Sequence, residues 1–461
     1  MMVFDPHKPE YWDKQDLERE MHRVVDVCNG CRLCDGLCPP FNDLFDRLDA
    51  IDDSQTAAGR GNENTVDQLS KADYKHTVDY CYQCKLCYPK CPYTPPHEYM
   101  LDFPRLLLRA QAIEVKEEGK SIREKIRDTV IADADRTGKL GSSMPAVMNW
   151  ANHNPTVRTI MQTAVGIHRE KKLPNYYGQT FREWFDANPP RTPEQPTGKI
   201  ALFFTCMLNN NKPWIGRQFV EILAANNIQV IAPEQECCGM PELGAGDVAK
   251  TIAAVDRNVA RLTPIVEAGY KLIAMSPSCS LMLRDEYENY ATDKDAAKKI
   301  KQAIVDPCEY LLQLHKQKQL NVAFPVSIGG KITYHLPCHL KFQNIGFPSR
   351  ELLKLLPNTS VTMVQQCSGH DGSWSMKAEY FTISIEVGAK LFKAIEKEQP
   401  NAIVVSDCVL AHLHIEQGSH TEPFHPIEIL YHAMGFTEHQ NPERSLSAQI
   451  ARSATSIHTS A

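Results

Sequence analysis

The chain has 461 residues, 43% of them hydrophobic, so it can bury large cores and is long enough for roughly three domains. Its formal net charge is −6 with both signs well mixed, which offers no basic surface for phosphate groups, and we expect no nucleic-acid partner. No stretch approaches the roughly eighteen uncharged apolar residues of a membrane span, so none is predicted.

The first residues, MMVFDPHKPEYWDKQ, lack a basic region followed by an apolar run and contain no twin arginine. We therefore predict neither a secretory nor a Tat signal, and we expect a cytoplasmic protein. Peripheral contact with the inner face of the membrane stays open. In a reducing compartment, the sixteen cysteines are poor disulfide candidates and good metal ligands.

Residues 1–105 are predicted to form a helical, ferredoxin-like domain, because two tight cysteine clusters lie there. Each has the form C-x-x-C-x-x-C-x-x-x-C-P, in which three cysteines hold one cubane and the fourth reaches across to the partner cubane. We therefore predict two interlocked [4Fe–4S] clusters. Their ligands are Cys28, Cys31, Cys34 and Cys91 for the first, and Cys81, Cys84, Cys87 and Cys38 for the second.

A pair of zinc sites is the alternative for these cysteines. Zinc sites favour C-x-x-C pairs set well apart rather than a run of four that ends in proline, so the motif favours iron and sulfide. Crossed ligation places the cubanes close together, and iron–sulfur centres change oxidation state with little ligand movement. The domain therefore suits electron relay rather than substrate chemistry.

Residues 106–197 are predicted to be a helical connector that ends in the proline-rich linker NPPRTPEQPTG. Apolar residues recur three or four apart in it, as expected for amphipathic helices. They are Met144, Val147, Met148, Ala151, Val157, Ile160, Met161 and Ala164. We expect this stripe to dock on a neighbouring domain rather than on a membrane, because the segment lacks a Lys-rich polar face.

Beyond the linker, short apolar runs alternate with helical segments, which predicts parallel sheets and α/β lobes. The runs are KIALFFTC, IQVIAPEQECCG, YKLIAMSPSC, KITYHLPCH, SVTMVQQCSG and NAIVVSDC. The cysteines in the first three runs correspond in order and context to those in the last three, so we predict a duplicated lobe. The expected boundaries are 198–325 and 326–437, followed by a polar tail at 438–461. The predicted fold class is thus α+β and multidomain.

The first lobe contains Cys237-Cys238-Gly239, with Cys206 before it and Cys279 after it. Adjacent cysteines can hold two atoms of a polynuclear cluster, and the glycine lets the backbone come close. All four cysteines fall at predicted strand ends, where the functional groups of open α/β sheets gather, so we predict a metal centre. The alternative is a set of buried structural cysteines.

In the second lobe the doublet becomes Cys367-Ser368-Gly369, which removes one thiolate. The nearby nitrogen and oxygen donors are His335, His339, His370, Asp371, His412 and His414. We predict a modified or mononuclear site. Its candidate ligands are Cys338, Cys367, Cys408, His339, His370 and His412. For each histidine, a polar loop residue is the alternative, and Cys308 is expected to be structural.

Taken together, these motifs resemble the CCG-domain (cysteine-rich) iron–sulfur oxidoreductases. This family includes the C subunit of anaerobic glycerol-3-phosphate dehydrogenase, the iron–sulfur subunit of glycolate oxidase and heterodisulfide reductase subunits. The resemblance extends from about Cys28 to about Gly435 and includes sequence segments such as SPSCSLMLRDEY and YHLPCH. It implies a ferredoxin half that passes electrons and a CCG half that holds a non-cubane cluster or another metal centre. The fuller motif ends C-x-x-C, whereas Met282 and Ala411 stand at those positions here.

We therefore predict an electron-transfer subunit that connects a partner redox enzyme, a flavoprotein dehydrogenase or a diiron protein, to the CCG site and to a quinone or another carrier. Two alternatives stay open. One is a stand-alone reductase of disulfides at the CCG site, and the other is a metal-stabilised docking protein. No G-x-G-x-x-G follows a predicted strand and no phosphate loop is present, so NAD, FAD or ATP chemistry is not expected within this chain.

Overall fold

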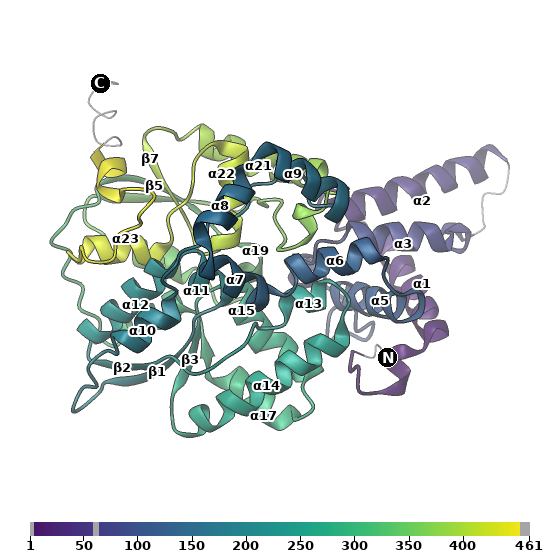
Figure 1. Cartoon of the computed structure of the whole chain (residues 1–461). Coiled ribbons are helices and arrows are strands. Elements are labelled where there is room, and N and C mark those ends of the chain that lie inside the picture. Colours follow the sequence, from purple (N-terminus) through teal and green to yellow (C-terminus); the bar gives the residue numbers. More distant parts are fainter. Residues whose placement is uncertain (1–3, 59–63, 452–461) are drawn as a thin grey trace.

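The computed structural model describes residues 4–58 and 64–451, and its N-terminal end is a bundle of helices (Figure 1). Side-chain caps begin several of them: Asp13 accepts the N–H of Asp16, and Ser70 and Asp73 cap each other's backbone. The fully buried Val24, Leu44 and Leu106 lie in the core of this end. Its helices are α1 (Lys14–Cys31), α2 (Pro39–Ala57), α3 (Lys71–Tyr80), α4 (Cys87–Lys90) and α5 (Phe103–Glu118), with short 3₁₀ turns at Pro9–Trp12 and Thr65–Gln68.

The connector crosses the middle of the molecule as a series of short helices (Figure 1). Prolines at the first positions of two of them, Pro145 and Pro155, start new helices where a single long one would otherwise continue. The helices are α6 (Ile122–Ile131), α7 (Ala134–Ser143), α8 (Pro145–His153), α9 (Pro155–Ile160) and α10 (Phe181–Ala187), with a π-helical turn at Met161–Val165.

The expectation that the apolar stripe of this region docks on a neighbouring domain is wrong for its outer half. Val147 and Ile160 are 58% and 60% exposed, and Trp150 between them is 60% exposed. The proline breaks turn successive helices in different directions, so the stripe is not one continuous face. Only its inner members, such as Met148 and Met161, face the interior, where they line a cavity described below.

The first α/β lobe contains a parallel four-stranded sheet of order β2-β1-β3-β4. Its strands are β1 (Gly198–Phe203), β2 (Ile228–Ile231), β3 (Lys271–Ala274) and β4 (Ile304–Val305). Its helices are α11 (Cys206–Asn210), α12 (Pro213–Ala225), α13 (Met240–Gly244), α14 (Val248–Glu267), α15 (Pro277–Leu281), α16 (Tyr287–Tyr290), α17 (Lys294–Ala303) and α18 (Pro307–Lys316), with a π-helical turn at Met282–Glu286. The central strands β1 and β3 are buried and apolar along most of their length, as expected for strands covered on both faces.

The second lobe contains a parallel three-stranded sheet of order β6-β5-β7, which matches the order β2-β1-β3 of the first lobe. Its strands are β5 (Gly330–His335), β6 (Thr359–Val364) and β7 (Ala402–Ser406). Its helices are α19 (Cys338–Phe342), α20 (Pro348–Leu353), α21 (Phe381–Glu396), α22 (Val409–Ser419) and α23 (Pro426–Ala433), with a 3₁₀ turn at Trp374–Met376. One core cluster contains Ile200 of the first sheet and Ile332 of the second, so the two lobes pack against each other.

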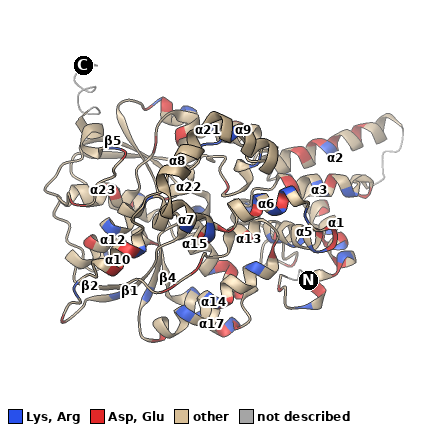
Figure 2. Ribbon diagram, viewed as in Figure 1, with Lys and Arg blue, Asp and Glu red and all other residues tan. Residues whose placement is uncertain are grey.

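All six predicted apolar runs form strands, and the predicted parallel sheets are confirmed. The short strand β4 was not predicted, because two residues are too few to show the alternation of apolar and polar side chains that marks a strand. Within the segment expected to be a polar tail, Leu446 is buried in the core shared by the lobes. Among the described residues, no helix is both long and apolar enough to cross a membrane. Charges of both signs are scattered over the helices, whereas α8 has none (Figure 2).

Candidate metal centres

The first ferredoxin motif lies between two helices. Cys28 and Cys31 are on the last turn of α1, which ends at Arg32 in the left-handed conformation (φ 53°). The chain then turns back, and Cys38 begins α2 as its N-cap residue. This reversal brings the cysteines of the run to one side of a short loop.

The second motif is coiled in a similar way. Cys81 ends α3, and the left-handed residues Gln83 (φ 49°) and Lys85 (φ 60°) wind the chain around Cys84. A non-glycine residue with positive φ is uncommon, and two within one loop mark a backbone that its surroundings hold in place. Cys91 then follows the short helix α4 as its C-cap.

The fold brings the fourth cysteine of each motif to the other motif. Burial raises the pKa of the Cys28 thiol, and the neighbouring thiols of Cys34, Cys91 and Cys31 raise it further. Burial likewise raises the pKa of Cys87, and among its neighbours are Cys81 and Cys38. The two motifs also meet each other, because the thiol of Cys34 lies close enough to Cys38 and Cys87 to raise their pKa values.

The loop of the second motif contacts the second lobe. The Cys367 thiol donates to the Tyr82 hydroxyl, with 3.7 Å between Sγ and Oη. The Gln83 carbonyl oxygen lies 3.0 Å from His339 Nε2. The thiol of Cys338 is the largest charge influence on Cys84 after burial. The ferredoxin end is therefore joined to the second lobe at its cysteine edge.

A buried ion network joins the same loop to the first lobe. Lys85, which lies between Cys84 and Cys87, pairs with Glu286, and both side chains are almost fully buried. Arg105 also binds Glu286, with 3.1 Å between Nε and Oε2. Burial alone would raise the pKa of Glu286, but Arg105 and Lys85 outweigh it and hold this pKa at about 2. The carboxylate therefore stays charged in the interior.

The four cysteines of the first lobe form a series of neighbouring thiols. Cys237 contacts both Cys206 and Cys238, and Cys238 in turn contacts Cys279. Asn258 holds the doublet, because its Nδ2 donates to the Cys237 carbonyl oxygen at 3.0 Å. Gly239 follows at φ 89°, a conformation that strongly favours glycine. The hydrogen bond with Cys237, together with burial, raises the pKa of the Cys206 thiol well above the usual range, and the hydrogen bond with Cys279 and burial do the same for Cys238.

The second lobe also gathers its cysteines. After burial, the thiols of Cys367 and Cys408 are the largest influences that raise the pKa of Cys338. The backbone N–H of Gly369 donates to Cys367 Sγ at 3.3 Å. Gly369 is required here by both its φ of 72° and its surroundings, since a Cβ would lie 1.9 Å from the Ser384 carbonyl oxygen. The buried Ser368 hydroxyl accepts from the backbone N–H of His370 at 3.4 Å.

Of the histidines proposed as ligands, two have both ring nitrogens bonded within the protein. His339 contacts Ser278 Oγ at 2.8 Å and the Gln83 carbonyl oxygen at 3.0 Å. His412 contacts Lys212 Nζ at 3.1 Å and the Ser406 carbonyl oxygen at 2.8 Å. Both ring nitrogens of each histidine are thus engaged within the protein, so this arrangement favours neither of the two as a metal ligand.

His370 differs, because its buried Nε2 has no hydrogen-bond partner in the described part of the chain. Its other nitrogen, Nδ1, lies 3.0 Å from Ser375 Oγ. A small cavity brings His370 to the same wall as Cys338, Cys367 and Cys408. An unpaired buried nitrogen beside thiols is the feature expected of an additional ligand.

A buried lysine behind His370 was not predicted. Lys171 Nζ lies 2.6 Å from His414 Nδ1 and 3.1 Å from Ser375 Oγ. Burial lowers the pKa of Lys171 to about 7. Tyr82 and Lys85 were missed as well, since their partners come from other parts of the fold and nothing in the local sequence marks them.

Cys308 lies apart from the candidate centres. It is fully buried at the start of α18, beside Asp407 and Ser349. Its surroundings fit the structural role expected of it.

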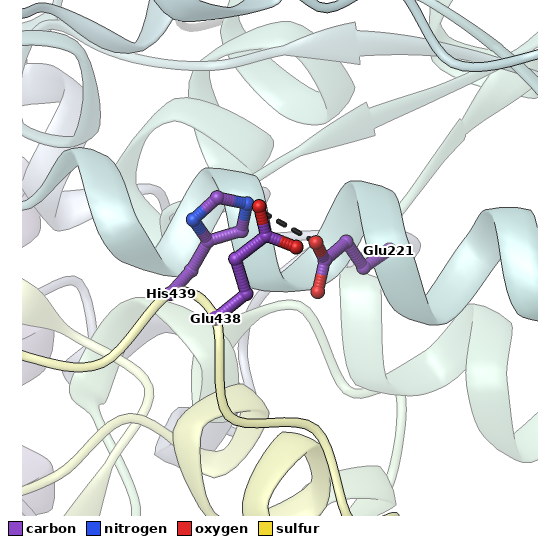
Figure 3. A group of neighbouring side chains, drawn as sticks. All are labelled: Glu221, Glu438 and His439. Atoms are coloured by element: carbon purple, nitrogen blue, oxygen red, sulfur yellow. Dashed lines mark ion pairs between the residues drawn. The ribbon is translucent and has the colours of Figure 1, made fainter.

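Within the described residues, only Glu221, Glu438 and His439 bring three ligand atoms within 4.8 Å of one another (Figure 3). His439 Nε2 pairs with Glu221 Oε1 at 3.1 Å, the Tyr431 hydroxyl also donates to Glu221, and Glu438 is exposed. These groups satisfy one another, so we assign them no metal. Among the described residues, no three cysteine thiols lie within 4.8 Å of one another.

Comparison with known proteins extends the resemblance. The model of the citrate utilization protein B Fer4-like domain matches residues 21–117, and that of the Cysteine-rich domain (CCG) matches twice, at 200–284 and 332–415. The chain therefore contains one Fer4-like domain and two CCG domains. Both CCG copies begin on the first strand of a lobe and contain its cysteine series.

Three relatives of this CCG-domain protein span most of its length. The C subunit of anaerobic glycerol-3-phosphate dehydrogenase from Escherichia coli (strain K12) is 28% identical over 68% of this chain and 78% of its own. The B subunit of fumarate reductase (CoM/CoB) from Methanothermobacter marburgensis is 22% identical over 85% of this chain and 79% of its own. The glycolate oxidase iron-sulfur subunit from Escherichia coli (strain K12) is 23% identical over 90% of this chain and 95% of its own.

Proposed function

We propose that this chain is an iron–sulfur electron-transfer subunit of a dehydrogenase or reductase. The observation that carries the proposal is that thiol groups of the two motifs and the two lobes lie near one another through the interior. The first motif meets the second through Cys34 and Cys38, and the second motif meets the second lobe through Cys84 and Cys338. The second lobe meets the first through Cys408, which raises the pKa of Cys279.

The ferredoxin cysteines fit two [4Fe–4S] clusters with crossed ligands. The thiols that would bind the first cluster are those of Cys28, Cys31, Cys34 and Cys91, and those for the second are Cys81, Cys84, Cys87 and Cys38. Ligands of one tetrahedral zinc ion, at about 2.3 Å from the metal, would lie about 4 Å apart. No three of these thiols are within 4.8 Å of one another in the described part of the chain, which favours a polynuclear cluster over zinc.

In the first lobe, Cys206, Cys237, Cys238 and Cys279 would hold an additional, non-cubane iron–sulfur cluster. Their arrangement as a series of contacting thiols supports a centre with several metal atoms. In the second lobe, Cys338, Cys367 and Cys408 would bind with His370 as the added nitrogen ligand. A mononuclear centre there receives less support, because these four residues do not gather within 4.8 Å.

The protein's own residues support transfer in three ways. The ion network of Lys85, Glu286 and Arg105 locks the second motif against the first lobe. His339 joins this motif to both lobes. Cys237, Cys238, Cys279 and Cys408 are buried, so water has little access to these thiols. Bound clusters would supply one-electron redox steps with little movement of their ligands.

The proposed partner is a flavoprotein dehydrogenase or a diiron protein, and the second carrier is another redox protein or a quinone. The names of the relatives support a subunit of a larger redox enzyme, since they are subunits of glycerol-3-phosphate dehydrogenase, fumarate reductase (CoM/CoB) and glycolate oxidase. We propose functional units at 1–105, 106–197, 198–325 and 326–437, consistent with strands that begin at Gly198 and Gly330.

A stand-alone reductase remains the second candidate, because a cavity lies beside the first-lobe cysteines. Turnover of a substrate by the purified chain alone would favour this candidate. Turnover only after a partner enzyme is added would favour the electron-transfer subunit.

The test of the main proposal is iron and sulfide analysis with EPR on the full chain, purified anaerobically. We expect at least about eight irons with acid-labile sulfide and two reducible cubane signals. Cys308→Ser is the matched control, because it removes a thiol outside the series and should leave the iron content unchanged. Zinc without acid-labile sulfide would overturn the proposal.

A further inference from the structure

The connector returns to the second lobe through the loop that follows its π-helical turn, residues 166–173. The Gly166 carbonyl oxygen accepts from the N–H of Ala378 at 2.8 Å, and the N–H of His168 donates to the Met376 carbonyl oxygen at 2.9 Å. The His168 ring also stacks on that of Phe381, with 3.9 Å between the ring centres. This loop is therefore fixed to the second lobe by backbone bonds and by an aromatic contact.

Arg158 holds the same loop from the inside. Its side chain is buried, and Nε donates to the Arg169 carbonyl oxygen at 3.1 Å. Nη2 donates to the carbonyl oxygens of His168 at 2.8 Å and Lys171 at 2.6 Å. A guanidinium offers its donors in a rigid plane, so three carbonyl groups bound to it keep one backbone shape. The backbone from which the Lys171 side chain enters the second lobe is thus fixed.

The Lys171 side chain ends between three side chains of the second lobe. Nζ lies 2.6 Å from His414 Nδ1, 3.1 Å from Ser375 Oγ and 3.5 Å from His370 Nδ1. None of the described carboxylates forms an ion pair with it. A lysine is almost never fully buried unless it is paired, and an imidazole and a hydroxyl serve as its partners here. Its burial is therefore explained by what it holds in place rather than by a counter-ion.

The proton positions of His414 follow from its two partners. Nε2 lies 3.2 Å from the Ser384 carbonyl oxygen, which can only accept, so Nε2 carries the proton. Nδ1 then accepts from Lys171 Nζ. His414 is thus an acceptor that fixes the end of the lysine side chain beside Ser375.

Ser375 extends this order to His370. The Ser375 hydroxyl donates to the Asp371 carbonyl oxygen at 3.3 Å, which leaves its oxygen to accept from Lys171 Nζ at 3.1 Å and from His370 Nδ1 at 3.0 Å. With its proton on Nδ1, His370 has the lone pair on Nε2. This nitrogen is the buried one that has no partner among the described residues. In the reverse arrangement Ser375 would donate to Nδ1, and a buried Nε2–H would be left without an acceptor.

We propose that Lys171 and Ser375 are positioning residues, which keep the proton of His370 on Nδ1 so that Nε2 can bind the metal centre of the second lobe. The proposal rests on the proposed function, because it requires a centre at the second-lobe cysteines, which share a wall with His370. Ligand histidines usually donate their other ring N–H to a neighbouring oxygen, and this partner sets the tautomer. The nitrogen would take the place of the thiolate that Ser368 does not supply.

The test is pulsed EPR of the full chain, purified anaerobically with ¹⁵N-labelled histidine. The second-lobe signal is the one that Cys338→Ser removes and Cys238→Ser leaves. We expect it to show one directly bound histidine nitrogen, which His370→Ala abolishes. Ser375→Ala should weaken the binding of the second-lobe iron in competition with a chelator about 10–100-fold and reduce the nitrogen coupling, because loss of a partner that orients a ligand has effects of this size.

Further variants separate positioning from folding. Ser375→Thr keeps the hydroxyl and should restore both the nitrogen coupling and the iron binding. Ser419→Ala removes another buried hydroxyl, which bonds to the Ile415 carbonyl oxygen in α22, and should change neither. Lys171→Met is expected to act like Ser375→Ala, and it takes the place of that variant if circular dichroism finds Ser375→Ala unfolded.

A second-lobe signal without a directly bound nitrogen would overturn the inference, and so would equal couplings in Ser375→Ala and the unmodified chain. A weak coupling, typical of an N–H that donates to sulfur, would place the proton on Nε2 instead. A sample in which no signal depends on Cys338 would overturn the inference as well. Iron and sulfide are measured on the same samples. Zinc without acid-labile sulfide would refute the proposed function, whereas intact iron and sulfide with no bound nitrogen would refute only the positioning by Ser375 and Lys171.

Discussion

The two lobes share the order of their first three strands but differ in chemistry and position. The first lobe keeps the doublet Cys237-Cys238, whereas the second has Cys367-Ser368 at the same point. The second lobe, which has one thiol fewer, is the one whose cysteines lie beside the loop of the second ferredoxin motif (the ferredoxin loop). Cys367 contacts Tyr82 of this loop, and Cys338 neighbours Cys84. All four cysteines of the lobe with the fuller set line the apolar cavity, whereas the second lobe lines it with other side chains, among them Trp374 and Tyr380. We therefore propose that two lobes of similar topology have different tasks, with an electron relay in the second lobe and the last metal centre of the series in the first.

The comparison is tested most strongly by Cys238→Ser. A serine hydroxyl stays protonated near neutral pH and is a weaker ligand than a thiolate, so the first-lobe centre should be lost with its EPR signal. Ser368→Ala, the counterpart in the second lobe, should leave the metal content nearly unchanged. The reverse pattern, with metal lost only from Ser368→Ala, would mean that the fuller and the modified lobes have been assigned the wrong way round.

The same contrast can be drawn between the two ferredoxin motifs. Cys91→Ser should damage the cluster of Cys28, Cys31 and Cys34, because the fourth cysteine reaches across. EPR with redox titration distinguishes the two cubanes. Damage confined to the cluster of Cys81, Cys84 and Cys87 would refute crossed ligation.

The link between the ferredoxin loop and the first lobe should be costly to break. Lys85→Met leaves Glu286 buried with Arg105 alone, and loss of one partner of a buried pair typically costs about 3–5 kcal/mol. Lys299→Met, which removes an exposed pair with Glu267, should cost about 1 kcal/mol or less. Denaturant unfolding of both proteins measures the difference, and equal midpoints would show that the buried network does not hold the modules together.

The pH dependence follows from the same carboxylate. The pKa of Glu286 is lowered to about 2 from a usual value of 4.5. Its contribution to stability is therefore complete above pH 4.5 and is lost as the pH falls toward 2. Glu286→Gln should remove this part of the acid sensitivity in pH-dependent unfolding, whereas Glu267→Gln should not. If the stability of Glu286→Gln and of the unmodified chain fell in the same way with decreasing pH, the assignment of this acid sensitivity to Glu286 would be wrong.

Much of the fold could be predicted, because its signals are local. Apolar runs followed by cysteines identified six strands and the edges where Cys206 and Cys338 lie. The exceptions depend on distant parts of the chain. His412 contacts Lys212, some two hundred residues away, and Lys171 of the connector is buried against His414 of the second lobe. No periodicity or spacing marks such pairs. The apolar stripe was misjudged because Pro145 and Pro155 divide it into helices that face different ways.

The smallest expected effect concerns the contact between the relay lobe and the ferredoxin loop. Tyr82→Phe removes the hydroxyl that lies 3.7 Å from Cys367 Sγ and that would donate to this sulfur once a metal has replaced the thiol proton. It keeps the ring, whose centre lies 5.1 Å from that of Trp374. Hydrogen bonds around a metal-binding sulfur adjust its centre without forming it, so the metal content should stay the same. The midpoint potential of the second-lobe centre should shift, whereas the first-lobe signal should not move. Tyr93→Phe, beside the other ferredoxin motif, is the matched control. If Tyr82→Phe changed the first lobe and left the second untouched, the ferredoxin loop would deliver electrons to the first lobe directly, and the division between relay and terminal lobes would fail.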